Sequence, residues 1–449
     1  MPEPPWSVDA TSTSAACPAP SVLGDPSPFR RLPSRSDALP AVAAVLGVGR
    51  VALSPHVCQI PTPLQEDTSM SQHTRTPRTA RIRRAGLAGL AVVTVAGLLS
   101  ACGYGSQGSS SSSDNSSPSV AASGSGAALS AGTVHIGYFA NLTHATPLIG
   151  IQDGKFAAAL GGTKIATQIF NAGPSEIEAL NSGAIDIAWV GPSPAINGYV
   201  KSQGAALKII SGATSGGAEL VVNPATIKSE ADLKGKKIAT PQAGNTQDVA
   251  LLNFLAGKGY KEDPKTGAGD VSVIRTDNSL TPGAYAAGQI DGAWVPEPTA
   301  SKLVSEGAKV LVDEKTLWPN NQFVSTNVIV SQTFLKAHPD VVKAVLKASV
   351  DTNAWITANP AQAKTDANAA LKALTGKALS AKVLDAAWSE LTVTNDPLAS
   401  TLQAEAQHAV TAGFIKQPSL AGIYDLTLLN QVLSGEGKPA VSAAGLGAQ

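Results

Sequence analysis

The chain has 449 residues, with 33 basic and 33 acidic side chains that give no net charge. This length allows two or three domains, or one large domain with two lobes. The balanced charge argues against nucleic-acid binding, which needs a concentrated basic surface. The cysteines are Cys17, Cys58 and Cys102, so the sequence after Cys102 has no disulfide, cysteine nucleophile or cysteine-based metal site.

Residues 70–101 contain the parts of a secretory signal. A basic stretch from Arg75 to Arg84 precedes an apolar run from Ala85 to Leu99, which is shorter than the ~20 residues needed to span a bilayer. The run ends in Leu99-Ser100-Ala101-Cys102, which resembles a bacterial lipobox. That resemblance implies export and a lipid anchor on Cys102 at the outer face of the cell membrane. An ordinary signal peptide with an incidental cysteine is the alternative.

The segments on either side of this signal are polar or of low complexity. Residues 1–69 are rich in Pro, Ser and Ala without a sustained apolar period, which is typical of disorder. Because a signal should begin a protein, we predict that Met70 is the true start. Residues 102–132 are dominated by Ser, Gly and Ala, which predicts a flexible tether.

After residue 132, short apolar runs suited to strands alternate with helical segments. The expected strands are residues 134–139, 164–170, 185–190, 207–212, 219–222, 237–240, 271–275 and a segment around Trp294. From Ser331 onward the pattern becomes helical, with Pro339 and Pro360 at helix boundaries. This alternation predicts an α/β fold with mostly parallel sheets.

A weak internal repeat predicts two similar lobes. Residues 185–190 (IDIAWV) are echoed by residues 290–295 (IDGAWV), and each copy follows a helix that ends in glycine. Chance similarity is the alternative. We expect residues 219–224 and 324–330 to cross between the lobes. Lobe 1 would then comprise residues 133–222 and 325–449, and lobe 2 residues 223–324, with a ligand cleft between them.

Three loops are candidates for an anion site, because open α/β sheets bind ligands beyond the carboxyl ends of their strands. They are residues 141–147, 191–195 and 242–248. A helix start carries unpaired N–H groups and about half a positive charge, so it can hold an anion without a cation. Hydroxyls and amides would complete the hydrogen bonds, from Thr143, Ser193, Asn245, Thr246 and Gln247. Helix capping is the competing interpretation of each loop alone.

Other residues near these loops allow two interpretations each. His144 can donate to an anion or lie exposed or in a cap. Trp189 and Trp294 can wall the cleft or pack in the core. Glu297 would repel an anion unless it orients a donor or pairs with a cation. Neither a Gly-x-Ser-x-Gly elbow nor a Walker loop occurs, and the histidines are too scattered to predict a metal site. We therefore expect no enzyme activity, no cofactor and no metal.

Three ordered motifs resemble the aliphatic-sulfonate, taurine and nitrate group of solute-binding proteins. They span residues 170–186, residues 232–246 and residues 288–298, and the similarity runs from about Val134 to Ser434. The resemblance implies a two-lobed type II periplasmic-binding fold with two hinge crossings. It also implies an ABC permease and ATPase as partners. The implied ligand is a small oxyanion, above all an aliphatic sulfonate. A nitrate-like anion, a thiamine-pyrimidine precursor and an enzyme on the same fold are the alternatives.

The loops and the resemblance together give one set of candidate ligand-binding residues in a chain that we expect to be monomeric. They are Asn141, Thr143, His144, Pro192, Ser193, Ser215, Gly216, Gly244, Asn245, Thr246, Gln247, Trp294 and Glu297. After Arg84 the sequence contains a single arginine, Arg275. If recognition needs a guanidinium, Arg275 must supply it; otherwise neutral donors and helix starts must suffice.

Overall fold

The computed structural model describes residues 128–447, which belong to one unit of contacting elements. The predictions for residues 1–69, for the signal at 70–101, for Cys102 and for most of the tether lie outside the described residues. The end of the predicted tether is fixed, because Ser130 N donates to Asp340 Oδ2 over 2.7 Å. Within the described range, no helix is both long enough and apolar enough to cross a membrane.

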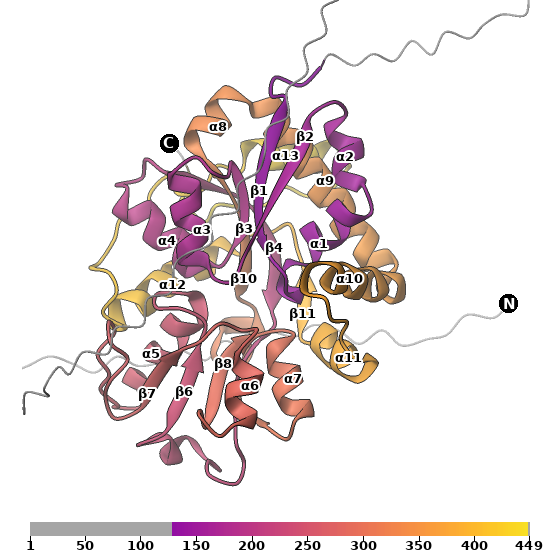
Figure 1. The fold of residues 1–449 in the computed structure, drawn as a ribbon. Coiled ribbons are helices and arrows are strands. Elements are labelled where there is room, and N and C mark those ends of the chain that lie inside the picture. Colours follow the sequence, from indigo (N-terminus) through magenta and orange to yellow (C-terminus); the bar gives the residue numbers. More distant parts are fainter. Residues whose placement is uncertain (1–127, 448–449) are drawn as a thin grey trace, which may run out of the picture. The chain divides into compact units, whose positions relative to one another are not determined.

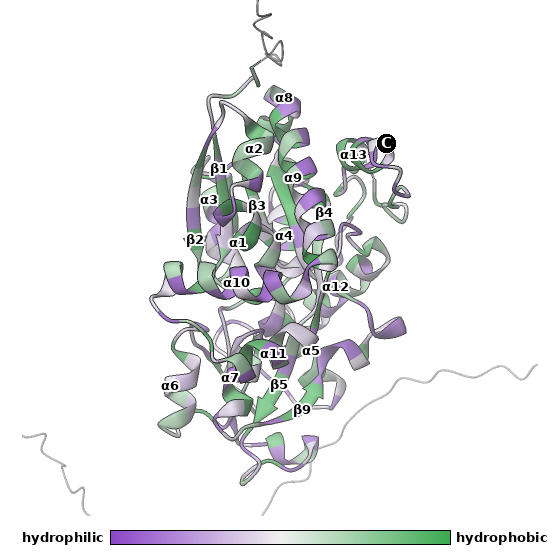
Figure 2. Cartoon of the chain, turned by 90° about the vertical axis from the view of Figure 1, so that its right-hand side faces the viewer, coloured by the Kyte–Doolittle hydropathy of each residue, from purple (hydrophilic) through white to green (hydrophobic). Residues whose placement is uncertain are grey.

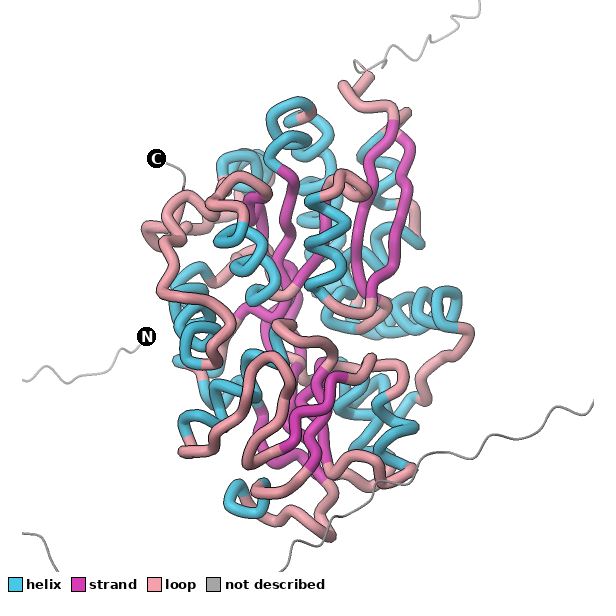
Figure 3. Tube along the Cα trace, turned by 60° about the vertical axis from the view of Figure 1, so that its left-hand side comes forward, coloured by secondary structure: helices cyan, strands magenta, loops and turns pink. Residues whose placement is uncertain are grey.

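Two β-sheets organise the described residues, each flanked by helices (Figure 1, Figure 3). The first runs in the order β11 (Leu391–Val393), β4 (Leu207–Gly216), β10 (Val324–Ser331), β3 (Ile187–Val190), β1 (Thr133–Phe139), β2 (Lys164–Phe170). The second runs in the order β7 (Ser272–Arg275), β6 (Lys237–Thr240), β8 (Gly292–Pro296), β5 (Ala218–Val222), β9 (Lys309–Asp313).

The sheets share one topology, which supports the repeat seen in the sequence. In each sheet, two parallel strands flank one strand, β1 in the first sheet and β6 in the second, and the next strand along the sheet is antiparallel. The repeated aspartates also match: Asp186 accepts from His135 N over 2.8 Å, and Asp291 accepts from Lys237 N over 2.9 Å. The sheets are mixed, so the expectation of mostly parallel pairing was wrong. The strands β10 and β5 run opposite to β3 and β8 because each follows a crossing between the lobes.

Helices cover the faces of both sheets. The first lobe carries α1 (Ala145–Gln152), α2 (Lys155–Leu160), α3 (Gly173–Asn181) and α4 (Pro192–Lys201). The second carries α5 (Thr246–Gly257), α6 (Thr281–Ala286) and α7 (Thr299–Ser305). The C-terminal segment adds α8 (Gln332–Ala337), α9 (Pro339–Ala358), α10 (Pro360–Thr375), α11 (Ala381–Ser389), α12 (Ala399–Thr411) and α13 (Thr427–Gly435). Proline begins α9 and α10, as predicted, because its missing N–H costs nothing there.

Apolar residues of the strands form the core of each lobe. All four residues of β3 and all five of β5 and β8 are buried, and Figure 2 shows β5 and β9 mainly in the colour of hydrophobic residues. This burial on both faces is typical of strands covered by helices on each side.

The predicted lobe boundary at residues 222 and 223 is wrong. Because β5 pairs in the second sheet, the chain leaves the first sheet between Gly216 and Gly217. Their φ angles of +77° and +74° lie in the left-handed region that favours glycine. The return runs from Glu314 to Phe323, between β9 and β10. The C-terminal helices also bridge the lobes, since α12 packs against both α4 and α5.

Candidate functional site

A cavity of about 20 Å³ lies where strand ends of the two lobes meet. Its lining residues are Phe139, Asn141, Thr143, His144, Gly191, Asn245, Thr246, Gln247, Asn278, Pro296 and Ser325. Phe139 ends β1, Gly191 directly follows β3, and Pro296 ends β8. The site therefore occupies the carboxyl ends of strands, where open α/β sheets bind ligands. Six of the predicted ligand-binding residues meet here.

The start of α5 supplies hydrogen-bond donors from the second lobe. No side chain of the described residues caps this helix, although Asn245 stands at its N-cap position. Among the described residues, no acceptor bonds to the N–H groups of Thr246 or Gln247, and the buried Thr246 Oγ1 also lacks a partner. These groups therefore form a set of unused donors within a buried site.

The Asn245 side chain bonds to Gly173 and Gln247 instead of capping α5, and the second bond leaves the Gln247 Nε2 group as a donor. Asn245 Oδ1 accepts from Gly173 N over 3.1 Å, and its Nδ2 donates to Gln247 Oε1 over 2.9 Å. With its oxygen engaged in this way, Gln247 can use its Nε2 group as a donor. The Gly173 bond also ties the start of α5 to the first lobe.

The first lobe contributes polar side chains from the turn η1 (Leu142–His144). Thr143 Oγ1 donates to Asn141 Oδ1 over 2.7 Å, which leaves the Asn141 Nδ2 group as a donor. His144 Nδ1 accepts from Phe139 N over 3.2 Å, so the ring proton lies on Nε2. Burial lowers the pKa of His144 to about 3, so the ring is a neutral donor at physiological pH.

The two lobes approach closely around this cavity. Leu142 N donates to the Glu297 carbonyl oxygen over 3.2 Å across the gap. A Cβ on Gly191 would lie 2.2 Å from Thr246 Oγ1. Glycine at this position therefore allows the start of α4 to come close to the start of α5.

Several predicted residues lie near the cavity without lining it. Pro192 and Ser193 are buried in the first turn of α4, and Ser193 Oγ has no partner among the described residues. Ser215 and Gly216 end β4 at the crossing between the lobes. The Gly244 backbone N–H donates to Asp248 Oδ2 over 2.9 Å, and Gly244 does not line the cavity.

Of the two interpretations of Trp189 and Trp294, the structure supports packing in the core. Trp189 and Trp294 are 0% exposed. Their rings pack edge-on against Phe156 and Phe254 at centroid distances of 5.7 Å and 5.5 Å. In addition, Trp294 Nε1 donates to Glu314 Oε2 over 2.7 Å. Both tryptophans therefore belong to the cores of their lobes.

The side chains of Glu297 and Arg275 each bond to groups outside the cavity. The Glu297 carboxylate accepts from Ser301 N over 3.1 Å and from Ser301 Oγ over 2.8 Å, in the first turn of α7. Burial raises the pKa of Glu297 to about 7. Arg275 Nε bonds to the buried Asp248 over 3.0 Å, and its Nη2 donates to the Pro264 carbonyl over 3.1 Å. Neither residue lines the cavity, so the donors there are neutral.

Five lining residues were outside the predicted set: Phe139, Gly191, Asn278, Pro296 and Ser325. Asn278 is notable because its buried Oδ1 has no partner within the described part of the chain. It follows β7 in the sequence Thr276-Asp277-Asn278. The same rule that selected the other loops, a polar residue after a strand end, would have found it.

A larger cavity of about 600 Å³ adjoins the small one. The two share Phe139, Asn141 and Asn278. The larger cavity also reaches Lys302 on α7 and Lys377 beyond α10. The arrangement suits a ligand with a compact polar head and a bulkier remainder.

Comparisons with known proteins identify the family. Residues 127–371 match the NMT1-like family. A binding protein of Brucella abortus (strain 2308) is 30% identical over 262 residues, which cover 56% of this chain and 78% of that protein. The taurine-binding periplasmic protein of Escherichia coli (strain K12) is 32% identical over 209 residues, which cover 46% of this chain and 62% of that protein.

Solved structures confirm the predicted fold. The alkanesulfonate-binding protein of Xanthomonas axonopodis pv. citri bound to MOPS matches with a TM-score of 0.54 at 22% identity, over 64% of this chain and 96% of that chain. The periplasmic nitrate-binding protein of Synechocystis PCC 6803 matches with a TM-score of 0.56 at 15% identity, over 69% of this chain and 90% of that chain. The predicted resemblance to sulfonate-, taurine- and nitrate-binding proteins is thereby confirmed. The chain belongs to the NMT1-like family, with the two-lobed α/β fold of periplasmic binding proteins.

Proposed function

We propose that this protein is an extracytoplasmic, lipid-anchored substrate-binding protein of an ABC importer that captures a small oxyanion, above all an aliphatic sulfonate, between its lobes. The observation that carries the proposal is the uncapped start of α5. There the N–H groups of Thr246 and Gln247 and the Thr246 hydroxyl face a buried cavity, and no acceptor within residues 128–447 bonds to them.

Neutral donors suit a monoanion. A hydrogen bond to a charged group contributes about 1.5–3 kcal/mol, and the partial positive charge of a helix start adds to it. In the described part of the chain, no arginine or lysine lines the small cavity, so an anion there would be held by neutral donors and the helix start. The amides of Asn141 and Gln247 can reach oxygens of the same head group from opposite lobes.

The adjoining cavity favours a sulfonate over an inorganic anion. A sulfonate has three oxygens on one side of its sulfur and an organic substituent on the other. The head fits the donor set around α5, while the space of about 600 Å³ can accept the substituent. Nitrate would use only the small cavity.

The proposed export and partners rest on the sequence before Cys102 and on the resemblance to solute-binding proteins. The basic and apolar segments before Cys102 support secretion, and the lipobox resemblance supports anchoring there. Closure of the lobes on the ligand would create the surface that a permease recognises, with an ATPase subunit driving import. We expect a monomer in this role.

Ligand-dependent melting of the purified full chain tests the proposal. Methanesulfonate, taurine, MOPS, nitrate and a pyrimidine would be compared at matched ionic strength. At a hundredfold excess over Kd, a sulfonate should stabilise the folded protein by ~2.7 kcal/mol. A response to none of the anions contradicts oxyanion binding, and a response to nitrate alone contradicts the choice of sulfonate.

A further inference from the structure

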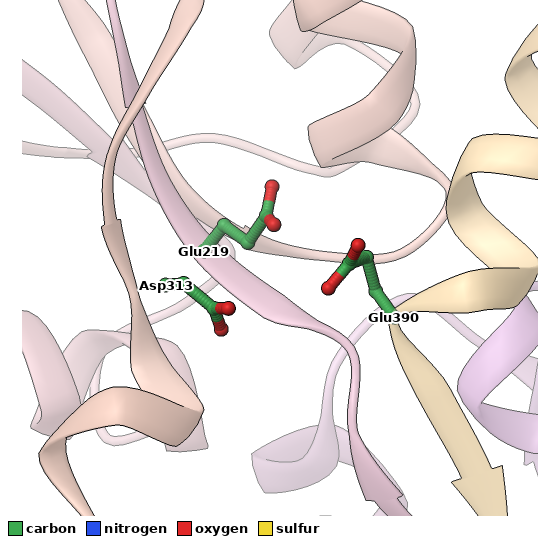
Figure 4. Close-up of side chains that lie close together, drawn as sticks. All are labelled: Glu219, Asp313 and Glu390. Atoms are coloured by element: carbon green, nitrogen blue, oxygen red, sulfur yellow. The ribbon is translucent and has the colours of Figure 1, made fainter. Parts of the chain in front are cut away.

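Three carboxylates meet where the chain crosses between the lobes. Glu219 lies on β5, Asp313 ends β9, and Glu390 follows α11 directly before β11 (Figure 4). One oxygen from each lies within 4.8 Å of the others. Two of these residues belong to the second sheet, and the third adjoins the first sheet.

These carboxylates mark both crossings. Glu219 comes shortly after Gly216 and Gly217, where the chain leaves the first lobe, and Asp313 directly precedes the segment that returns. A Cβ on Gly216 would lie 2.6 Å from the Glu390 carbonyl oxygen. The backbone of Glu390 is therefore in close contact with the first crossing.

The Lys315 ammonium group pairs with two of the three carboxylates. Lys315 Nζ lies 3.0 Å from Asp313 Oδ2 and 2.6 Å from Glu390 Oε2. Glu219 is only 6% exposed, yet between residues 128 and 447 no hydrogen bond or ion pair reaches its carboxylate. Figure 4 shows this carboxylate turned toward that of Glu390.

The surroundings of Glu219 raise the pKa of its carboxyl group. Burial raises the pKa of Glu219 to about 8, and the nearby carboxylates of Glu297, Glu390 and Asp313 add to the effect more than Lys315 opposes it.

The ligand chemistry selects a hard divalent cation. All three groups offer oxygen, which suits Ca²⁺ at metal–oxygen distances of about 2.3–2.6 Å. Oxygens on opposite sides of such an ion lie at most about 5 Å apart, which matches the spacing of this cluster. The Lys315 side chain is 33% exposed, so it can turn toward solvent when an ion enters.

We propose that Ca²⁺ binds Glu219, Asp313 and Glu390 and ties together the two crossings between the lobes. Water and carbonyl oxygens would complete the coordination. The ion would stabilise the arrangement of the lobes in this structure, and this inference stands independently of the ligand in the cleft.

Calorimetric titration of the chelator-treated full chain with CaCl₂, together with its melting temperature, tests this site. We expect saturable binding and a rise in melting temperature that NaCl at matched ionic strength does not reproduce. Glu219→Gln should weaken Ca²⁺ binding at least tenfold while folding normally, because glutamine resembles the protonated side chain. Glu178→Gln, on the exposed side of α3, should bind as the unmodified chain does.

Lys315→Met provides an independent readout. Removing the competing ammonium should tighten Ca²⁺ binding, whereas a lysine uninvolved in the site would leave it unchanged. The proposal is overturned if the unmodified chain shows no Ca²⁺ binding, if NaCl gives the same stabilisation, or if Glu219→Gln binds Ca²⁺ as well as the unmodified chain.

Discussion

Gly191→Ala should weaken ligand binding while leaving the protein folded. Gly191 has φ of −66° and ψ of 157°, angles that alanine adopts without strain. Its added Cβ would lie 2.2 Å from Thr246 Oγ1 and 3.2 Å from Thr246 Cβ. Ordinary contact begins near 3.4 Å, so the start of α5 must retreat or the Thr246 hydroxyl must rotate away. Either response disturbs the donor set.

Overpacking of this kind costs about 1–3 kcal/mol. If the cost falls on the closed state alone, the Kd for methanesulfonate should rise roughly 5- to 150-fold. Titration calorimetry measures the Kd, and the melting temperature without ligand reports the fold. Gly257→Ala is the matched control, because it lies on the same helix with open space around its Cβ.

Two results would refute this reasoning. Methanesulfonate affinity equal to that of the unmodified chain would show that the approach of the two helix starts is irrelevant to binding. Loss of folding in the ligand-free protein would show that Gly191 serves the structure alone.

Three further substitutions test separate parts of the account. Thr246→Val keeps the shape but removes the unpartnered hydroxyl, so calorimetry should show roughly 10-fold weaker sulfonate binding at an unchanged melting temperature; unchanged affinity would exclude the hydroxyl from the site. His144→Gln should lower affinity by the same factor at pH 5.5 and pH 8, because the pKa near 3 keeps the ring neutral at both; a loss confined to pH 5.5 would instead assign binding to the imidazolium. Without Ca²⁺, the raised pKa of Glu219 contributes stability that is fully present below pH 4.5 and lost as pH rises to about 8. Chemical denaturation should therefore give similar free energies of unfolding for the unmodified chain and Glu219→Gln below pH 4.5, and the unmodified chain should become the less stable of the two as pH rises to about 8. A constant difference across this window would contradict the raised pKa.

The strands could be predicted from sequence because their apolar runs are bounded by glycine, proline and polar turns. Residues 164–170 and 237–240 were predicted with the bounds of β2 and β6. The site loops could be found because ligand positions in this fold class follow strand ends. That rule located Thr143 and the start of α5 without any knowledge of their contacts.

The faces of buried strands could not be predicted. Trp189 lies on a strand that is buried on both sides, so alternation of polar and apolar residues gives no sign of which side faces a cleft. For a similar reason the sequence did not show that β5 belongs to the second sheet, because an apolar run does not reveal which sheet it joins. The cluster of Glu219, Asp313 and Glu390 depends on contacts across long stretches of sequence, which spacing alone does not encode.

The central claim is that the start of α5 receives a negative ligand. Backbone amide NMR shifts during titration with methanesulfonate test it most directly. If the start of α5 binds the ligand, the amide signals of Thr246 and Gln247 should move downfield and by more than those of other helix starts. Shifts confined to residues around Lys302 and Lys377, with Thr246 and Gln247 unmoved, would contradict it.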